Sequence, residues 1–327
     1  MADLSTTYLG LRLRNPVIAA SSRMTGSVDG LVEFERAGAG AVVLKSLFEE
    51  QIVSDVGAMV GSLDPLPHSE AADLFRGSGK SYYLNEYLRL VKDAKAALSI
   101  PVIASVNSVS DGTWLEYANE LENAGADGLE LNVFILPSDR RTDPRNTEKR
   151  YIDICRKVKE RVSIPVAMKI GTYFSGLAGM VHSLADAGAN GLVLFNRFYR
   201  PDVDIEKMRV VAAPVLSVPE ELNLSLQWIA LLSGEISCDL CAATGVHDGA
   251  GVIKQLLVGA RAVQACSAFF KYGKDRLSSM LSDLEGWMGR HGFKTIDDFR
   301  GSLAQEGSED PGIYERSQYI KALVGIS

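Results

Sequence analysis

The sequence predicts an α/β protein folded as one (β/α)8 TIM barrel, with an N-terminal hairpin and long loops after strands 2 and 4. Eight short apolar runs, rich in alanine or β-branched residues, recur along the 327-residue chain and end in small or polar residues. Most of the intervening segments carry apolar residues at i, i+3 and i+4, which is the helical period. Strands that alternate with helices pair in parallel, and eight such units in about 270 residues predict a barrel.

The expected strands and helices follow each other in regular order. The strands are expected at residues 15–22, 38–46, 101–108, 125–132, 165–171, 188–196, 236–245 and 259–267. The helices are expected at residues 29–37, 87–98, 114–124, 151–162, 176–187 and 249–258. Several strands follow Ala-Gly-Ala, where a glycine ends the preceding helix. Because no stretch resembles a linker, we expect residues 1–327 to form a single domain.

Four segments lie outside this repeat. Residues 1–14 alternate in polarity and predict a hairpin that turns at Gly10 and closes the barrel floor. Residues 47–85 and 134–150 predict long loops after strands 2 and 4, where barrel sites are built. Residues 274–325 are expected to form helices packed outside the barrel.

The composition excludes several classes of protein. A net charge of −7 argues against a general nucleic-acid binder, and no apolar run is long enough to span a membrane. The N-terminus lacks a signal-peptide pattern, and four cysteines do not make a disulfide framework, so the reducing cytoplasm is expected. Cys238 and Cys241 have C-x-x-C spacing, but in a strand they point to opposite faces, which favours packing over a redox or metal site. No metal site is expected.

Polar residues at the carboxyl ends of barrel strands are candidates for a functional site. Each of them alone could simply cap the barrel mouth, but two lysines and three asparagines converge on one rim. A lysine at the end of an apolar strand also needs an anionic partner, because a buried unpaired ammonium is costly. The candidates are Ser21, Ser22, Lys45, Ser46, Asn107, Asn132, Lys169, Asn196 and Arg197.

Small residues end strands 7 and 8, at the corner where this fold commonly holds a phosphate on backbone N–H groups. Thr244 and Gly245 follow the seventh strand, and Cys266 and Ser267 follow the eighth. Small side chains also end strands for packing reasons. The pattern therefore predicts a phosphate site at this corner.

Several motifs in this order resemble the dihydroorotate dehydrogenase family, and the resemblance covers essentially the whole chain. They are "LGLRLRNPVIAASS", "GAGAVVLKS", "GADGLELN", "PVAMKI" and "VQACSAFFKYG". The chain is most similar to the soluble class of these FMN-containing barrels. The resemblance implies an FMN-dependent oxidoreductase acting on a CH–CH group, as in pyrimidine biosynthesis, and a homodimer.

The resemblance also implies a role for each candidate. Ala20 and Ser21 would lie beside the flavin, Lys45 and Ser46 would contact flavin and substrate, and Lys169 would lie near flavin N1. A cation there stabilises the negative charge that builds on the N1–C2=O edge during reduction. The remaining expected contacts are Asn107, Asn132 and Asn196 at the flavin and substrate, and Thr244, Gly245, Cys266 and Ser267 at the phosphate, with Ser233 and Gly234 nearby.

One departure from the family concerns the catalytic base. In the family a cysteine or serine within three residues of Glu-Leu-Asn takes a proton from the substrate, and here Ile135 stands in its place. Three explanations compete. Another group could act instead, the substrate could need only hydride transfer, or the barrel could have kept FMN without chemistry. We favour the second explanation. The candidates under the first are Ser138, Asp139, Tyr173 and His68.

Two further classes of function remain open. Lys169 could form a Schiff base in a flavin-free lyase that binds phosphate, or the chain could be a catalytically silent FMN-binding protein. The leading hypothesis is an oxidoreductase for a small anionic or carbonyl-bearing substrate, held by Lys45 and Asn196. Because the chain has no iron–sulfur cysteine cluster, we expect a diffusible electron acceptor.

Overall fold

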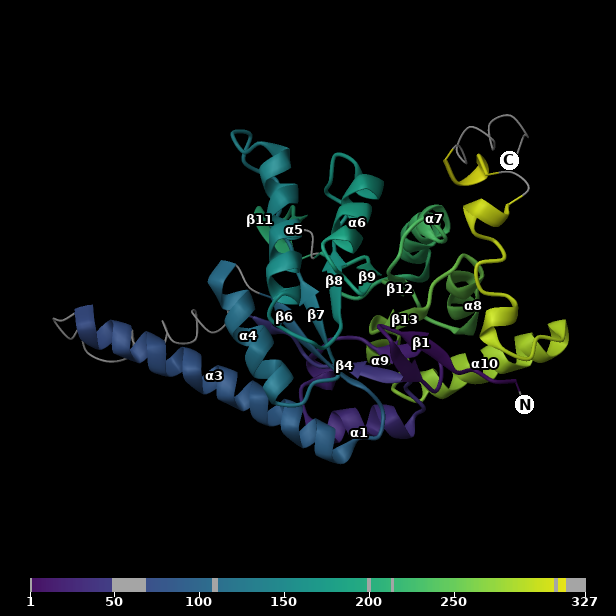
Figure 1. Cartoon of the computed structure of the whole chain (residues 1–327), viewed down its shortest axis with the longest axis horizontal. Coiled ribbons are helices and arrows are strands. Elements are labelled where there is room, and N and C mark those ends of the chain that lie inside the picture. The colour runs from purple at the N-terminus through teal and green to yellow at the C-terminus, as the bar shows by residue number, and fades with distance from the viewer. Residues whose placement is uncertain are drawn as a thin grey trace.

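Eight parallel strands close into a barrel (Figure 1). The computed structural model describes residues 2–48, 69–107, 111–198, 201–212, 215–308 and 311–315. The barrel strands are β3 (Val17–Ala19), β4 (Ala41–Val43), β6 (Val102–Asn107), β7 (Gly128–Asn132), β8 (Val166–Ile170), β9 (Gly191–Leu194), β12 (Asp239–Ala243) and β13 (Ala262–Ala265). Parallel pairing of β13 with β3 closes the ring. The predicted (β/α)8 TIM barrel is confirmed.

Helices surround the barrel on its outer side (Figure 1). They are α1 (Val28–Arg36), α3 (Ser69–Ala97), α4 (Asp111–Asn123), α5 (Pro144–Lys159), α6 (Leu177–Asp186), α7 (Leu222–Leu232) and α8 (Gly249–Leu257). The short α9 (Ser267–Tyr272) follows the last strand, and α10 (Arg276–His291) packs outside, as expected for this part of the tail. Within the described residues, no helix combines the length and the apolar character needed to cross a membrane.

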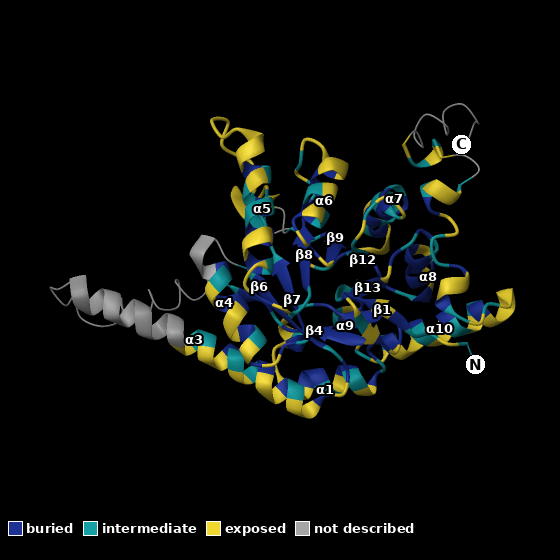
Figure 2. Cartoon of the chain, in the orientation of Figure 1, coloured by how far each residue is buried: buried dark blue, intermediate teal, exposed yellow. Residues whose placement is uncertain are grey.

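The core has two layers, and the strands between them are buried on both sides (Figure 2). The outer layer lies between strands and helices. The inner layer fills the barrel and includes several small side chains, among them Ala41, Ala167 and Ala262. A sheet buried on both faces explains why the strands read as nearly continuous apolar runs.

The N-terminal hairpin closes the barrel floor, as predicted. Strands β1 (Thr6–Tyr8) and β2 (Leu11–Leu13) are antiparallel, and the turn contains Gly10 with φ +73°. Tyr8 and Leu9 insert between the strands from below. A Cβ built on Gly191 would lie 2.6 Å from Leu9 Cδ2, so the glycine in β9 leaves room for the hairpin that fills the bottom of the barrel.

The long loops differ from the prediction. The segment 47–85 contains the short strand β5 (Leu47–Phe48) and, from Ser69, the first turns of α3, while residues 49–68 lie outside the described residues. The two prolines of this segment precede Ser69, so neither of them interrupts α3. After strand 4, α5 begins at Pro144 because Asp143 caps it, accepting a hydrogen bond from the Arg145 N–H at 2.9 Å.

A second hairpin, which the sequence did not predict, follows β9. Its strands are β10 (Pro201–Asp204) and β11 (Arg209–Ala212), and its side chains are largely exposed. It separates Phe198 from the short helix η2 (Pro219–Glu221) that leads into α7. The other described 3-10 helices are η1 (Arg23–Thr25), η3 (Ile296–Asp298) and η4 (Gln305–Gly307).

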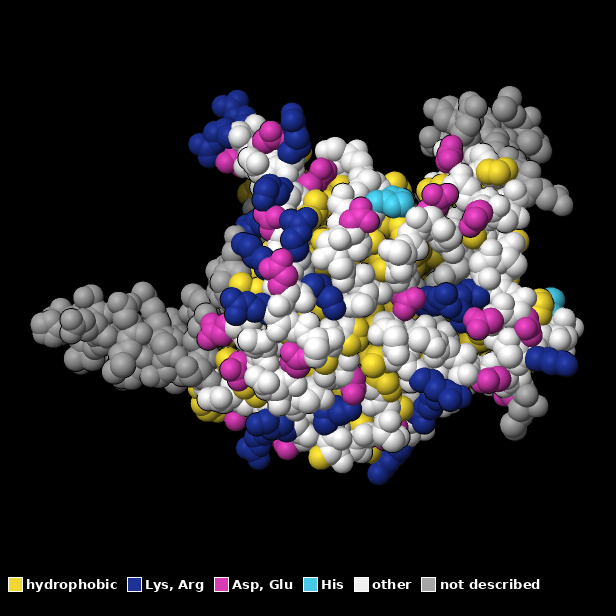
Figure 3. Space-filling view, viewed as in Figure 1, with side chains coloured by type: hydrophobic (Ala, Val, Ile, Leu, Met, Phe, Trp, Pro, Cys, Tyr) yellow, Lys and Arg dark blue, Asp and Glu magenta, His cyan; other side chains and the backbone are white. Residues whose placement is uncertain are grey.

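The outer face of α5 is basic although the whole chain is acidic. Lys and Arg side chains gather along this helix in Figure 3, while Tyr151, Ile154 and Val158 on its other face are buried. The basic side chains are therefore the solvated face of an amphipathic helix, which agrees with the helical period read from the sequence.

Candidate cofactor and substrate site

A cavity of about 440 Å³ opens at the carboxyl ends of the strands. Residues at or just after the ends of all eight barrel strands line it. Its size falls within the range of pockets that hold cofactors and small ligands. The predicted candidates that line it are Ala20, Ser21, Ser22, Lys45, Ser46, Asn107, Asn132, Lys169, Asn196, Arg197, Thr244, Gly245, Cys266 and Ser267.

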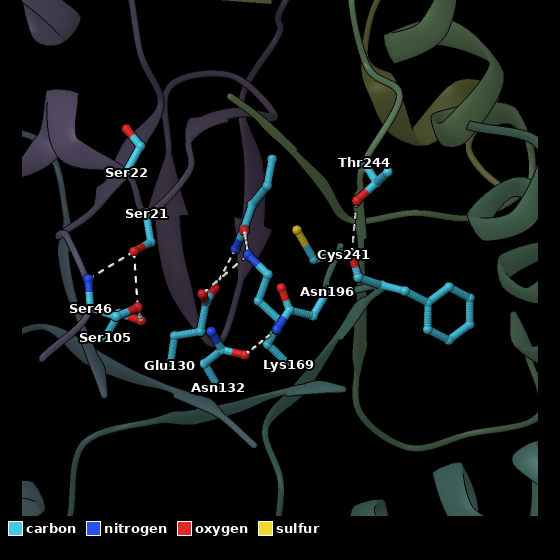
Figure 4. Close-up of polar contacts among 12 residues, drawn as sticks. Ser21, Ser22, Ser46, Ser105, Glu130, Asn132, Lys169, Asn196, Cys241 and Thr244 are labelled. Carbon is cyan, nitrogen blue, oxygen red and sulfur yellow. Dashed lines mark hydrogen bonds and ion pairs between the residues drawn. The ribbon is translucent and has the colours of Figure 1, made fainter. Parts of the chain in front are cut away.

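Charged and amide groups form the floor of this cavity (Figure 4). The Lys169 ammonium donates to Gln264 Oε1 at 2.8 Å and lies 3.4 Å from Glu130 Oε1. Gln264 Nε2 in turn donates to Glu130 Oε2 at 2.5 Å. The anionic partner predicted for a lysine in this position is therefore Glu130, and Gln264 is a lining residue that sequence reasoning missed.

Two asparagines face each other across the rim. Asn196 Nδ2 donates to Asn132 Oδ1 at 2.6 Å, so the remaining oxygen of Asn196 and the amide nitrogen of Asn132 can serve a ligand (Figure 4). Asn107 lines the same cavity from the end of β6. The rim thus offers paired amide groups, which can donate to and accept from one planar molecule.

Serine hydroxyls connect the ends of β3, β4 and β6. Ser46 Oγ lies 3.0 Å from Ser21 Oγ and 2.7 Å from Ser105 Oγ, and the Ser46 N–H donates to Ser21 Oγ at 2.9 Å. This network fixes the backbone beside Lys45. The Lys45 ammonium has no hydrogen bond or ion pair with another described residue, and Lys45 lines the cavity, so its charge is available to an anion there.

The corner between β12 and β13 requires glycine. Thr244 and Gly245 have φ values of +73° and +79°, and a Cβ on Gly245 would lie 2.2 Å from the Leu222 backbone nitrogen. The Thr244 hydroxyl donates to the Phe195 carbonyl at 3.0 Å, which holds this left-handed turn. The turn and the first residue of α9 line the cavity, and backbone N–H groups at such positions can bind an anion.

A loop residue that sequence reasoning missed completes this corner. The Ser217 N–H donates to Ser267 Oγ at 2.9 Å, and Ser217 Oγ lies 3.1 Å from His247 Nε2. Burial, with a further contribution from Lys271, lowers the pKa of His247, so the ring is neutral and its tautomer can suit the serine. No strand-end signal marks Ser217, because it follows the unpredicted hairpin.

The structure does not bring Ser233 and Gly234 to this site. They lie in a different cavity, with Arg261 and Arg300, at the end of α7 that precedes β12. A helix that leads into a strand ends at the amino-terminal side of the barrel, whereas the small residues of the corner follow the strands. Their predicted place beside the phosphate is therefore wrong.

From Glu130 in β7 to Ile135, successive side chains point in alternate directions. Glu130 contacts Lys169 at the floor, and Asn132 and Phe134 line the cavity. Leu131 is in the outer core, and Ile135 packs against that core. The alternation of a strand thus continues past Asn132, and the residue facing the cavity here is Phe134 rather than Ile135.

Aromatic rings form this side of the cavity. Phe134 stacks on Phe198 with ring centroids 3.4 Å apart, and both rings line the cavity. The Tyr173 ring lies 6.4 Å from Phe134 and is 44% exposed. Ile135 is held elsewhere, because its N–H donates to the Tyr151 hydroxyl at 2.9 Å.

The candidates for a replacement base are not among the residues that line the cavity. Ser138 and Asp139 are exposed, and hydrogen bonds from Arg141 lower the pKa of Asp139, which makes it a weaker base. Tyr173 contacts the aromatic rings but does not line the cavity. His68 lies outside the described residues. Among the candidates that the structure describes, none is placed to take a proton from a ligand.

The cysteines of the C-x-x-C pair are free thiols. Burial raises the pKa of Cys238 to about 12 and raises that of Cys241 further. Cys241 lies in the barrel interior below Glu130 and Lys169. Protonated buried thiols act as packing residues, in line with the sequence interpretation.

Fold and site together define a class of protein: a barrel with a polar, cationic mouth and a glycine-dependent corner that could hold a phosphate-bearing cofactor. The family model for dihydroorotate dehydrogenase matches residues 3–288, and the chain belongs to this family.

Curated relatives agree along nearly their whole length. A protein of Aeropyrum pernix, provisionally named dihydroorotate dehydrogenase A (fumarate), is 27% identical over 91% of this chain and 97% of its own. The dihydroorotate dehydrogenase B (NAD(+)) catalytic subunit of Thermoplasma volcanium is 25% identical over 92% and 98%. Dihydroorotate dehydrogenase A (fumarate) of Limosilactobacillus reuteri is 26% identical over 90% and 96%.

Membership makes the chain a flavin-dependent oxidoreductase whose cofactor is FMN. The residues present fit this group. The Gly245 turn leaves room where any Cβ would clash with Leu222, and the Lys169 ammonium faces the cavity with two of its three hydrogens occupied. Lys169, Ser21 and Asn132 could hold the ring, and the corner could hold the phosphate.

Proposed function

We propose that this protein transfers hydride between FMN and a small anionic or carbonyl-bearing substrate, without the protein base that dihydroorotate oxidation uses. The observation that carries the proposal is the aromatic wall: Phe134 and Phe198 line the cavity, while Ile135 is turned into the core. A proton on carbon needs a positioned acceptor to leave at a useful rate. This wall offers none.

The polar rim supplies the substrate contacts in this proposal. Lys45 pairs with an anionic group, and the paired Asn132 and Asn196 bind a carbonyl or amide edge. Phe134 and Phe198 exclude water from the opposite side. Such convergent contacts orient a small planar molecule, and orientation is a large part of the catalytic effect.

The chemistry balances as a two-electron transfer. FMN, held by Lys169, Ser21 and Asn132, would supply the two-electron acceptor for the hydride released when one substrate C–H bond breaks. The accompanying proton leaves the oxidised substrate for water at the cavity mouth. The residues of this chain contribute binding, charge and exclusion of water at the reacting carbon.

Lys169 supports the flavin function better than the Schiff-base alternative. Imine formation needs an amine that is free to attack a carbonyl carbon, whereas the Lys169 nitrogen is already bound to Glu130 and Gln264. Borohydride treatment with a carbonyl ligand should therefore leave Lys169 unmodified. A trapped adduct on Lys169 would support the lyase.

The test of the function is an anaerobic screen. Purified holoprotein is mixed with small carboxylates, hydroxy acids and carbonyl compounds, and flavin bleaching is followed near roughly 450 nm. We expect at least one compound to bleach the flavin and dihydroorotate to fail. Rapid bleaching by dihydroorotate would overturn the proposal, and a panel that never bleaches would instead support a silent FMN-binding protein.

A matched pair of lysine variants tests the rim. Lys45→Met should abolish bleaching while the flavin spectrum stays intact, because Lys45 lines the cavity and lacks another described partner. Lys254→Met changes an exposed lysine on α8 and should have no effect. Equal behaviour of the two variants would show that no anionic group binds at Lys45.

The electron acceptor is proposed to be diffusible. The names of the relatives mention fumarate and NAD(+), and one is called a catalytic subunit. Reduced holoprotein should regain its absorption on mixing with a dicarboxylate or nicotinamide acceptor. If neither restores it, an acceptor bound to a partner protein becomes the better hypothesis.

A further inference from the structure

A closed triad of side chains lies beneath the cofactor cavity. Glu130 on β7, Lys169 on β8 and Gln264 on β13 make three mutual contacts of 2.5–3.4 Å (Figure 4). Glu130 is 1% exposed and Lys169 is 8% exposed. Both ends of the Gln264 amide are used, so its orientation is fixed by the charged pair.

Only one face of this triad is turned towards a ligand. An ammonium has three hydrogens, and two of those on Lys169 point to Gln264 and Glu130. Lys169 and Gln264 line the cavity, whereas Glu130 does not. The carboxylate therefore stands behind the ammonium as seen from the cofactor.

The neighbours below the triad carry no charge. Tyr8 and Cys241 lie in the barrel interior, and burial raises the pKa of both groups above the physiological range. Asp239 lies further towards the floor, where its carboxylate accepts from the Leu9 N–H and contacts Arg261. Among the described residues, Glu130 is thus the charged group that contacts the Lys169 ammonium beneath the cavity.

A carboxylate so close to the lysine must weaken the field that the lysine projects. Reduction puts negative charge on the FMN edge that faces a cation, and an uncompensated ammonium in a buried site would favour the reduced cofactor strongly. We propose that Glu130 is a positioning residue that aims the Lys169 ammonium into the cavity and lowers the reduction potential of bound FMN. The inference uses FMN binding and does not depend on which substrate is oxidised.

The test is a spectroelectrochemical titration of FMN in the holoprotein, which needs no substrate. Glu130→Gln removes the charge with little change of shape. We expect it to raise the midpoint potential, with reduced FMN favoured at least tenfold over wild type, or about 30 mV for a two-electron couple. An unchanged or lowered potential in FMN-loaded protein overturns the proposal.

A charge swap distinguishes electrostatics from packing. The double variant Glu130→Gln with Gln264→Glu keeps one carboxylate in the triad and moves it to the other position beside Lys169. We expect the potential to return towards the wild-type value. If the double variant keeps the raised potential of the single variant, the carboxylate has no electrostatic role and the proposal fails.

A third variant keeps the proposal testable if Glu130→Gln does not fold. Glu130→Asp keeps a carboxylate but moves it one methylene away from Lys169, so it should raise the potential by less than Glu130→Gln does. The melting temperature of each apoprotein is measured beside the potential. A purely structural role would change the melting temperature and FMN occupancy while leaving the potential of the loaded fraction unmoved, and that result also overturns the proposal.

Discussion

Gly245→Ala provides a quantitative test of the corner between β12 and β13. Gly245 has φ +79°, and an added Cβ would lie 2.2 Å from the Leu222 nitrogen and 2.7 Å from its Cα. The left-handed backbone costs an L-residue about 1–2 kcal/mol. Overpacking against backbone costs about 1–3 kcal/mol more. We therefore expect the free energy of unfolding to fall by about 2–5 kcal/mol.

Gly292→Ala is the matched control for the backbone effect. Gly292 has φ +77° at the end of α10, and a Cβ there would meet nothing within 4 Å. This variant should lose only about 1–2 kcal/mol. Urea unfolding of the apoproteins gives both values on one scale. The difference between the variants isolates the contact of the corner with the start of α7.

The same pair reports on the cofactor. Displacing Leu222 also displaces the loop that carries Ser217, whose N–H binds Ser267. We expect Gly245→Ala to weaken FMN binding at least tenfold, about 1.4 kcal/mol, as measured by recovery of flavin fluorescence on dilution. Gly292→Ala should bind FMN normally. Equal stability losses and equal FMN affinities in the two variants would refute the reasoning.

Four other outcomes are expected. Ile135→Cys alone should leave the response to dihydroorotate unchanged, because the residue packs against the core and its N–H is bound to Tyr151; faster anaerobic bleaching would contradict this. Asn196→Ala removes the donor to Asn132 and should slow substrate bleaching about fivefold or more, from the roughly 1 kcal/mol that a hydrogen bond contributes. Burial lowers the pKa of His247, so this histidine binds a proton at a higher pH in the unfolded protein than in the folded protein. The free energy of unfolding should therefore fall as the pH drops below about 6.5, the ordinary histidine pKa. His247→Gln should flatten that part of the urea-unfolding profile, and an identical profile would exclude the histidine as its cause. The homodimer implied by the family resemblance predicts a particle of twice the chain mass in light scattering, and a monomer at assay concentration would exclude it.

The barrel and most of its rim follow from local patterns in the sequence. Parallel strands all end at one rim, so a polar residue after each strand is enough to place Lys45, Asn132 and Lys169 in the same cavity. Contacts that form only when the ring of strands closes could not be predicted from these local patterns. Glu130 and Gln264 are 134 positions apart on strands that are not neighbours, and their contact exists only because the barrel closes.

The errors have the same origin. Ser233 and Gly234 resemble the small polar pairs of the phosphate corner, but composition does not say at which end of the barrel a pair lies. That depends on whether the pair follows a strand or a helix. Ser217 was missed because an extra hairpin, β10 and β11, separates it from the end of β9, so no strand end marks it in the sequence.

The sequence could have predicted which side chains after β7 face the cavity. Glu130, Asn132 and Phe134 share one face of an extended chain, and Leu131, Val133 and Ile135 share the other. The structure follows this period of two beyond the last strand residue. Among the described residues after β7, the lack of a base that faces the cavity is therefore not explained by the substitution at Ile135 alone. Because the whole segment continues as a strand-like extension, a cysteine at that position would face the helices. Within the proposed function, an inward-facing base would require a different backbone path from Val133 to Pro137. The outward-facing Ile135 and the inward-facing Phe134 of the aromatic wall therefore follow from one backbone arrangement.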